Sequence, residues 1–149
     1  MATIEMLQLQ PVVQRLKAEA PLLREVGVAA DLAALLKAGS VRASPSAFVL
    51  LESAVPTQIH EGSGPLRQTF DVTVAVILAA GLAGAKGAAA IAALEAPQGQ
   101  IRAAMFGWSA PGTWRRFWFG AEGIEDFNDQ TGVVLYRHNF TCQVRIQEP

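Results

Sequence analysis

The sequence contains one cysteine, Cys142, and only two histidines, His60 and His138, among its 149 residues. A single cysteine excludes an internal disulfide and any metal cage built from several thiolates. Two histidines far apart in the chain are too few for a histidine-rich metal site. The surroundings of Cys142, residues 140–144, alternate apolar with polar residues and indicate a buried thiol on a strand. The sequence therefore predicts neither a metal site nor a bound cofactor.

Charged residues are also scarce. They make up 17% of the chain, whereas about 25% is usual in soluble domains. The balance of 12 Lys and Arg against 13 Asp and Glu gives a net charge of −1, so no overall basic field exists to attract nucleic acid phosphates. We therefore expect no specific nucleic-acid binding. Apolar residues make up 51% of the chain, and such a sparsely charged surface predicts large contacts with other chains.

Long uninterrupted apolar runs are missing as well. The longest apolar stretch, residues 70–94, is broken by Asp71, Lys86 and several glycine and threonine residues, so no membrane span is predicted. The first residues show no basic segment followed by an apolar run, and we expect no secretory signal and a location in the cytoplasm.

Aromatic residues, by contrast, are concentrated in one region. Nine of the eleven lie between Phe106 and Phe140, most densely over residues 107–120. Aromatic and arginine side chains are the favoured anchors of protein contacts, and no paired acid and base stands near them. The region therefore predicts a binding or assembly surface. Its proposed contact residues are Trp108, Trp114, Arg115, Arg116 and Phe117.

Arg115 and Arg116 have an alternative interpretation. Arginines among aromatic rings also stack on bases in proteins that bind single-stranded nucleic acid. The acidic stretch that follows them argues against this use. We favour a hydrophobic strand whose two arginines face a neighbouring subunit.

Apolar residues recur at three- and four-residue steps in several segments, which is the period of a helix packed on one side. Gly39 is a predicted C-cap, and Pro97 is expected to restart a helix that ends at Gly107. The predicted helices cover residues 6–20, 31–38, 81–95 and 97–106.

Other segments show the two-residue alternation or the short apolar runs of strands. Pro56 is expected to end the first of them, and residues 129–132 are expected to form a turn. The predicted strands cover residues 46–52, 67–78, 114–120, 123–127 and 133–147. This order predicts a single α+β domain over residues 1–149, with an antiparallel or mixed sheet of about four main strands and helices on one face.

The polar, glycine-containing segment between Pro56 and Pro65 reads as an extended loop. Surface loops of this kind often carry binding residues and become ordered when a partner docks. We predict a mobile docking loop whose contact residues are Gln58, His60, Glu61 and Arg67.

Three motifs in the sequence could carry chemistry. His60 beside Glu61, together with His138, would suit a small ligand-binding or hydrolytic α+β domain. However, His138 lies on the apolar side of its strand, which favours a partly buried, hydrogen-bonded histidine or a subunit contact. Residues 81–87 resemble a phosphate loop, but Lys86 is followed by glycine rather than a hydroxyl residue. The acidic residues Glu122, Glu125, Asp126 and Asp129 lack EF-hand spacing and read as a solvated loop.

The order of these segments resembles a known family. Residues 101–108 (Ile-Arg-Ala-Ala-Met-Phe-Gly-Trp) precede Pro111, a glycine-bearing acidic hairpin and a long last strand. Earlier, Ser46-Ala47-Phe48-Val49 is followed by a loop and by residues 67–74 (Arg-Gln-Thr-Phe-Asp-Val-Thr-Val). Over roughly residues 8–147 the chain resembles the tail terminator, or tail completion, proteins of long-tailed bacteriophages.

This resemblance implies a structural protein of the virion and not an enzyme. It implies a small α+β subunit that forms a homo-hexameric ring on the head-proximal end of the tail tube. The ring would stop tube polymerisation and offer a docking surface to the head connector, with DNA passing through its lumen. Its expected partners are further copies of itself, the tail tube protein and a connector or neck protein. A different neck or head–tail connector component is the alternative within the same particle.

Overall fold

The protein, seen here as a computed structural model, is described over residues 2–41, 43–81 and 88–149. Its five strands form one sheet in the order β1-β2-β3-β5-β4. β1 is parallel to β2, and every other pair of neighbours is antiparallel. The elements are α1 (Gln10–Glu19), β1 (Glu25–Val28), α2 (Ala29–Ala38), β2 (Ser46–His60), β3 (Arg67–Gly81), α3 (Ala88–Met105), β4 (Trp118–Asn128) and β5 (Val133–Gln147).

This arrangement confirms the predicted α+β class with a mixed, mostly antiparallel sheet. The sheet has one strand more than the four expected, because β1 was not recognised in the sequence. β1 is only four residues long and pairs with the first part of β2, from Ser46 to Val49. Beyond Val49, the outer edge of β2 has no neighbouring strand in the described residues.

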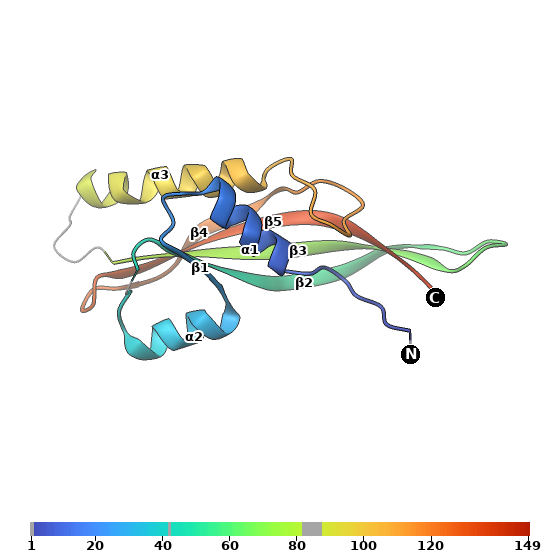
Figure 1. Ribbon diagram of the computed structural model, residues 1–149, viewed down its shortest axis with the longest axis horizontal. Helices are drawn as coiled ribbons and strands as arrows, with labels where there is room; N and C mark the ends of the chain where they lie inside the picture. The colour runs from blue at the N-terminus through green and yellow to red at the C-terminus, as the bar shows by residue number, and fades with distance from the viewer. Residues whose placement is uncertain (1, 42, 82–87) are drawn as a thin grey trace.

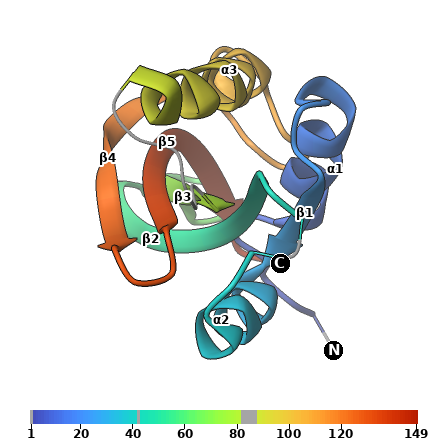
Figure 2. The same ribbon diagram turned by 90° about the vertical axis from the view of Figure 1, so that its left-hand side faces the viewer.

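The main core lies between one face of the sheet and the helices α1 and α3 (Figure 2). The predicted stripe of α1 supplies Val12, Val13 and Leu16, all buried. From α3 come Ile101, Ala104 and Met105, as the periodicity predicted. These side chains pack on alternate residues of the central strands, including Val74 and Phe140, so the two-residue period of the strands directs one apolar row to this face.

A second, smaller core lies on the opposite face. There Phe48, Ala75 and Ile77 pack with Leu32 and Leu35 of α2. α2 therefore covers the other side of the sheet from α1 and α3 (Figure 1), so that the helices do not all lie on the single face that was expected. Gly39 ends α2 with a φ of 71°, as predicted for a left-handed C-cap.

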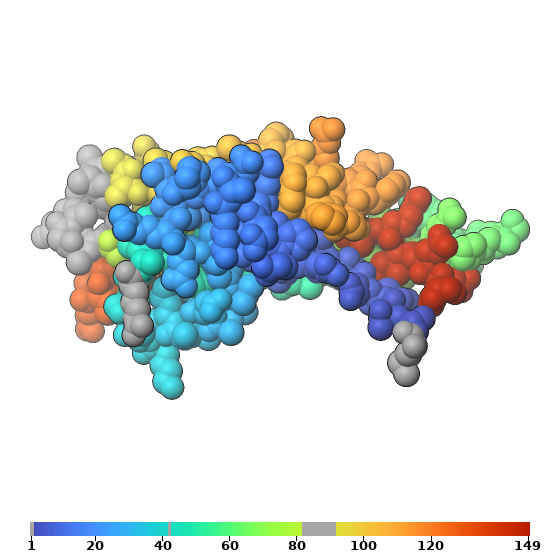
Figure 3. Space-filling model, viewed as in Figure 1, coloured from blue at the N-terminus to red at the C-terminus, as the bar shows by residue number. Residues whose placement is uncertain are grey.

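The predicted docking loop is mostly strand. β2 continues through Pro56 to His60, so Gln58 and His60 are in β2, Arg67 begins β3, and only Glu61 lies in the connection. Proline is tolerated here because an edge strand needs no amide hydrogen on its open side. The pairing of β2 with β3 also shifts its register between Pro56 and Gln58. The resulting hairpin, in green, projects beyond the rest of the molecule (Figure 3).

Two further boundaries differ from expectation. α3 continues through Pro97 instead of restarting there, because buried Pro97 and Ile101 and the half-buried Leu94 hold this helix against the sheet. Residues 113–117 are not strand, and β4 begins only at Trp118 and runs unbroken to Asn128. The glycine-rich segment that resembled a phosphate loop begins at Gly81, the last residue of β3, and its residues 82–87 lie outside the described residues.

Candidate assembly surface

β4 forms an open edge of the sheet that is exposed along nearly its whole length. An edge strand presents unpaired backbone groups, and soluble proteins usually protect such edges with charge or cover. β4 contains the acidic residues Glu122, Glu125 and Asp126, which were expected in a solvated loop. It also carries four large apolar side chains that reach solvent. Their exposed fractions are 37% for Trp118, 47% for Phe119, 70% for Ile124 and 55% for Phe127.

The start of β4 is tied to the end of α3 by stacked rings. The ring centroids of Phe106 and Phe119 lie 4.5 Å apart and nearly parallel, although both side chains are about half exposed. A bulge follows between Phe119 and Glu122. At Gly120 in this bulge a Cβ atom would lie only 3.1 Å from the Cβ and the carbonyl oxygen of Asn139. Glycine therefore allows the close approach that the bulge requires.

Trp114 and two arginines form a cluster beside β5, which we call the Trp114 cluster. The guanidinium carbon of Arg145 lies 4.1 Å from the Trp114 ring centroid, and that of Arg115 lies 4.8 Å away. Stacking over an indole fixes the plane of a guanidinium and leaves its N–H groups free to bind acceptors. Within the described residues, neither of these arginines nor Arg116 belongs to an ion pair. The cluster thus offers fixed donors to an incoming partner.

Arg145 was missed as a candidate because it lies far from Trp114 in the sequence. The two are brought together by backbone hydrogen bonds, since the amides of Trp114 and Arg115 both donate to the carbonyl oxygen of Gln143 on β5, at 2.8 and 3.2 Å. The alternation of β5 did place Arg145 on its polar side, but no pattern indicated which loop would meet it.

Phe117 and Trp108 do not belong to the exposed surface. Phe117 is 1% exposed and forms part of the main core, so its prediction as a contact residue is wrong for the folded chain. Trp108 is half-buried, lies 6.0 Å from Phe117 between ring centroids, and is covered by Arg15 at 5.4 Å. Backbone hydrogen bonds from Gly107 to Phe117 and from Phe117 to Trp108, each 2.9 Å, hold both rings inward.

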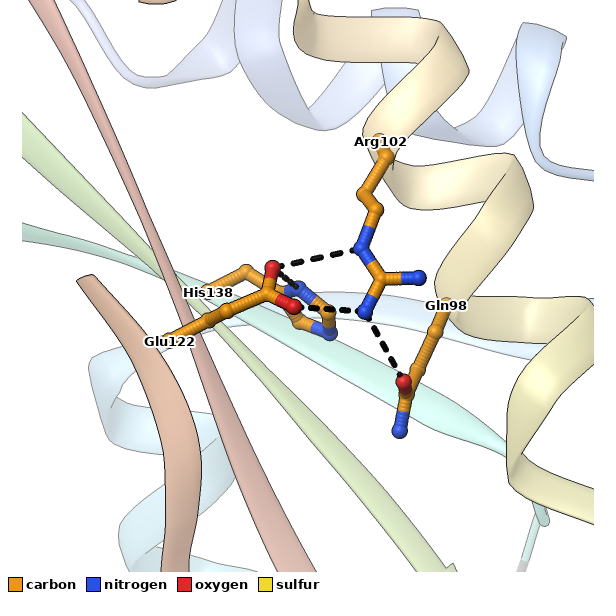
Figure 4. A network of polar contacts seen from close by, with 4 residues as sticks. All are labelled: Gln98, Arg102, Glu122 and His138. Carbon is orange, nitrogen blue, oxygen red and sulfur yellow. Dashed lines mark hydrogen bonds and ion pairs between the residues drawn. The ribbon is translucent and has the colours of Figure 1, made fainter. Parts of the chain in front are cut away.

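A polar network joins β4 to β5 and α3 (Figure 4). Glu122 of β4 accepts hydrogen bonds from Nε and Nη2 of Arg102 on α3, at 3.2 and 2.6 Å. Glu122 also accepts a hydrogen bond from Nδ1 of His138 on β5, at 3.1 Å. Arg102 in turn donates a hydrogen bond from Nη2 to the side-chain oxygen of Gln98, at 3.1 Å. His138 is fully buried, with Tyr136 at 4.8 Å between ring centroids. The network fixes the position of the edge strand relative to the helix above it.

The pKa values in this network follow from its geometry. Burial lowers the pKa of His138, against the smaller opposing effect of its hydrogen bond to Glu122. The hydrogen bond from Arg102 lowers the pKa of Glu122. At neutral pH the network therefore consists of a neutral imidazole, a carboxylate and a guanidinium.

We expect His138 to make the protein less stable in mild acid. Because its pKa is lower in the folded than in the unfolded chain, the unfolded chain binds a proton first as the pH falls from 7 towards 5. The free energy of unfolding should fall over that range with a slope of at most about 1.4 kcal/mol per pH unit. His138→Gln keeps an N–H donor for Glu122 but cannot titrate, so urea titrations of this variant should show a flatter dependence on pH. Equal slopes in the two proteins would contradict this role of His138.

The two histidines do not form one site. In the sheet, His60 of β2 lies opposite Arg67 of β3, whereas His138 of β5 lies opposite Val76 of β3. Because Arg67 and Val76 are nine residues apart on β3, the two histidines lie about 30 Å apart along the strands. The predicted hydrogen bonding of His138 is confirmed, and its side chain is fully and not partly buried. In the described ranges, no three His, Cys, Asp or Glu side chains gather as they would around a metal ion. His60 and His138 therefore cannot act together at one hydrolytic site.

Comparison with known proteins decides the family. The family model for phage tail terminator proteins matches residues 2–149. The chain belongs to the phage tail terminator family. It is accordingly a structural protein of the virion tail, as the resemblance in its sequence implied.

Other comparisons of this tail terminator family member are less informative. A solved chain from the virion of a native gene transfer agent particle shows 18% sequence identity and a TM-score of 0.48, covering 93% of this chain and 92% of that one. A search of curated protein sequences finds no match. In the part of this tail terminator that is described, none of the helices combines the length and hydropathy needed to cross a membrane.

The predicted buried thiol of this tail terminator is confirmed as well. Cys142 is fully buried on β5. Burial, with a smaller effect from the nearby Asp71 carboxylate, raises the pKa of the thiol to about 12. Because the thiolate is the reactive form of cysteine, we expect Cys142 to react little with alkylating reagents in the folded protein.

Proposed function

We propose that this protein closes the head-proximal end of the tail tube as a homo-hexameric ring. In that position it ends tube polymerisation and presents a docking surface to the head connector. Membership of the tail terminator family supports the location, and the two open edges of one sheet support the ring. These edges are the single structural observation on which the proposal depends.

The edges are unlike each other. One is β4, which is exposed and carries both acidic and large apolar side chains, and the other is β1 together with the part of β2 beyond Val49. Unlike surfaces on opposite sides of a subunit join head to tail, and such a contact closes into a ring when the rotation between copies allows it. Closure buries every edge, which removes the risk of uncontrolled strand pairing that the isolated chain carries.

The remaining candidate contact residues lie at positions that suit contacts with neighbouring proteins. Trp114, Arg115 and Arg116 remain at the surface and are available to a neighbouring protein. The hairpin end that carries Gln58, His60, Glu61 and Arg67 projects from the body of the subunit, where it is suited to reach a partner. Phe117 acts from inside the core by holding the Trp114 segment in place.

The ring is tested by mixing the purified protein with assembled tail tubes. We expect native mass spectrometry and electron microscopy to show a sixfold ring of this protein, alone or at one end of each tube, and tubes of defined length. A stable monomer that does not bind tubes would contradict the proposal. A ring that binds the head portal but not the tube would instead identify another neck or connector component.

A further inference from the structure

One row of residues runs straight across the sheet from edge to edge beyond the helix α2. Val55 of β2 is opposite Asp71 of β3, and Asp71 is opposite Gln143 of β5. The carbonyl oxygen of Gln143 accepts the amide of Trp114 at 2.8 Å. Val55 and Trp114 therefore end the same row on opposite sides of the subunit.

The two ends of this row are apolar and exposed. Val55 is 54% exposed and Trp114 is 46% exposed, in a part of the sheet where the middle of the row is polar, with a hydrogen bond of 3.0 Å between Gln143 and Asp71. The Trp114 ring already carries the Arg115 and Arg145 guanidiniums. Both guanidiniums pack over the ring, which argues against base stacking and leaves the edge of the indole for a small apolar side chain.

From this row we infer that Val55 of one copy packs against Trp114 of the next copy around the ring. The inference rests on the proposed ring. It specifies which residues of two adjacent copies lie opposite each other. A head-to-tail neighbour continues the row, so that Val55, Asp71, Gln143 and Trp114 are followed by the neighbour's Val55. The partner is therefore a second copy of this chain.

The adjacent row supports the same register. It runs from Gln58 through Thr69 to Arg145. In the joined copies the neighbour's Gln58 comes to the side where Arg115 and Arg145 hold their unpaired N–H groups, and Glu61 follows three residues later. An amide oxygen and a carboxylate are suitable acceptors for guanidinium donors.

Pro56 determines the nature of the contact. It has no amide hydrogen and stands next to Val55 on the open side of β2. A backbone ladder across this part of the interface would therefore be interrupted. The contact is made mainly by side chains, which places its specificity in Val55 and Trp114.

A pair of variants at Val55 tests the inference. Val55→Lys places a positive charge against the indole and the two guanidiniums stacked on it, and we expect ring formation, measured by native mass spectrometry across a concentration series, to need at least about tenfold more protein. Val55→Thr keeps the branched shape and should stay within threefold of the original chain. Equal ring formation by both variants would overturn the inference, as would rings of the Lys variant that fail only to bind the tube. Absence of rings from the original chain would instead remove the proposed function.

Cross-linking tests the register directly. In the double variant Val55→Cys with Arg116→Cys, a short bis-maleimide linker should join adjacent copies into ladders up to the full ring. The matched control is Glu95→Cys with Arg116→Cys, since Glu95 is exposed on α3 away from the row, and it should give no ladder. Cys142 adds no background because its thiol is buried. Ladders in both variants, or in neither while rings form, would reject the register.

Discussion

Phe117→Ala is expected to lower the free energy of unfolding by about 3–5 kcal/mol, the usual cost of removing a fully buried phenylalanine. Phe117 is 1% exposed and contacts the main core. Its backbone also accepts from Gly107 and donates to Trp108, but the substitution leaves these bonds available. The loss comes from buried apolar surface and from the cavity that remains.

The matched variant is Trp114→Ala, three residues earlier in the same segment. Trp114 is 46% exposed, so its loss should change the free energy of unfolding by less than about 1 kcal/mol, while it weakens ring formation. Urea denaturation and native mass spectrometry of both variants separate the two effects. If Trp114→Ala proved as destabilising as Phe117→Ala, the assignment of one residue to the core and the other to the surface would be wrong.

Ile124→Lys combined with Phe127→Lys is expected to abolish ring formation, with an increase of at least about a hundredfold in the concentration needed for assembly. Both side chains lie on the exposed edge strand β4, at 70% and 55% exposure. Lysine on an edge strand is a common natural device against strand pairing. The two added charges would also be desolvated if a neighbour docked there. The stability of the single subunit should change little, because neither side chain is buried.

A control with the same added charge lies on α3. Ala92→Lys with Ala103→Lys changes two exposed helix positions that are not on a sheet edge, and this variant should still assemble. Analytical ultracentrifugation over a range of concentrations compares the two. Rings from the β4 variant, or loss of rings from the α3 variant, would show that β4 is not the assembling edge.

The regular elements could be predicted from the sequence where one face is buried along their whole length. β5 has the bounds expected from its alternation, Val133–Gln147, because it pairs on both sides and every second residue enters the core. The stripe of α1 and the C-terminal half of α3 were likewise found. In these segments local periodicity and tertiary burial give the same signal.

Elements at the margins were missed for physical reasons. β1 has four residues and no room for an alternation to show. The outer part of β2 is polar and contains Pro56, which suggests a loop unless one knows that the strand is at an edge. Residues 113–117 have the composition of a strand, but backbone bonds to Gln143 hold them as an irregular segment.

The candidate surface could be found only in part. Aromatic density indicated a region in which Trp114, Arg115 and Arg116 are exposed, and their role as contact residues stays a prediction. The burial of Phe117 and the contact between Arg145 and Trp114 depend on how residues 113–117 fold back on β5. The Arg102–Glu122–His138 network joins a helix to two strands, and no spacing in the sequence signals a contact that only the fold creates.

The strand order β1-β2-β3-β5-β4 has a consequence for direction. Copies joined through two unlike edges all point the same way, so any ring they close has no two-fold axis across it and its two rims differ in composition. One rim would be made of the projecting β2–β3 hairpin ends and the other of the turns between β4 and β5, which lie at opposite ends of the subunit (Figure 1). Such a ring is a polarised adaptor: a single protein shows one set of residues to what lies below it and another to what lies above.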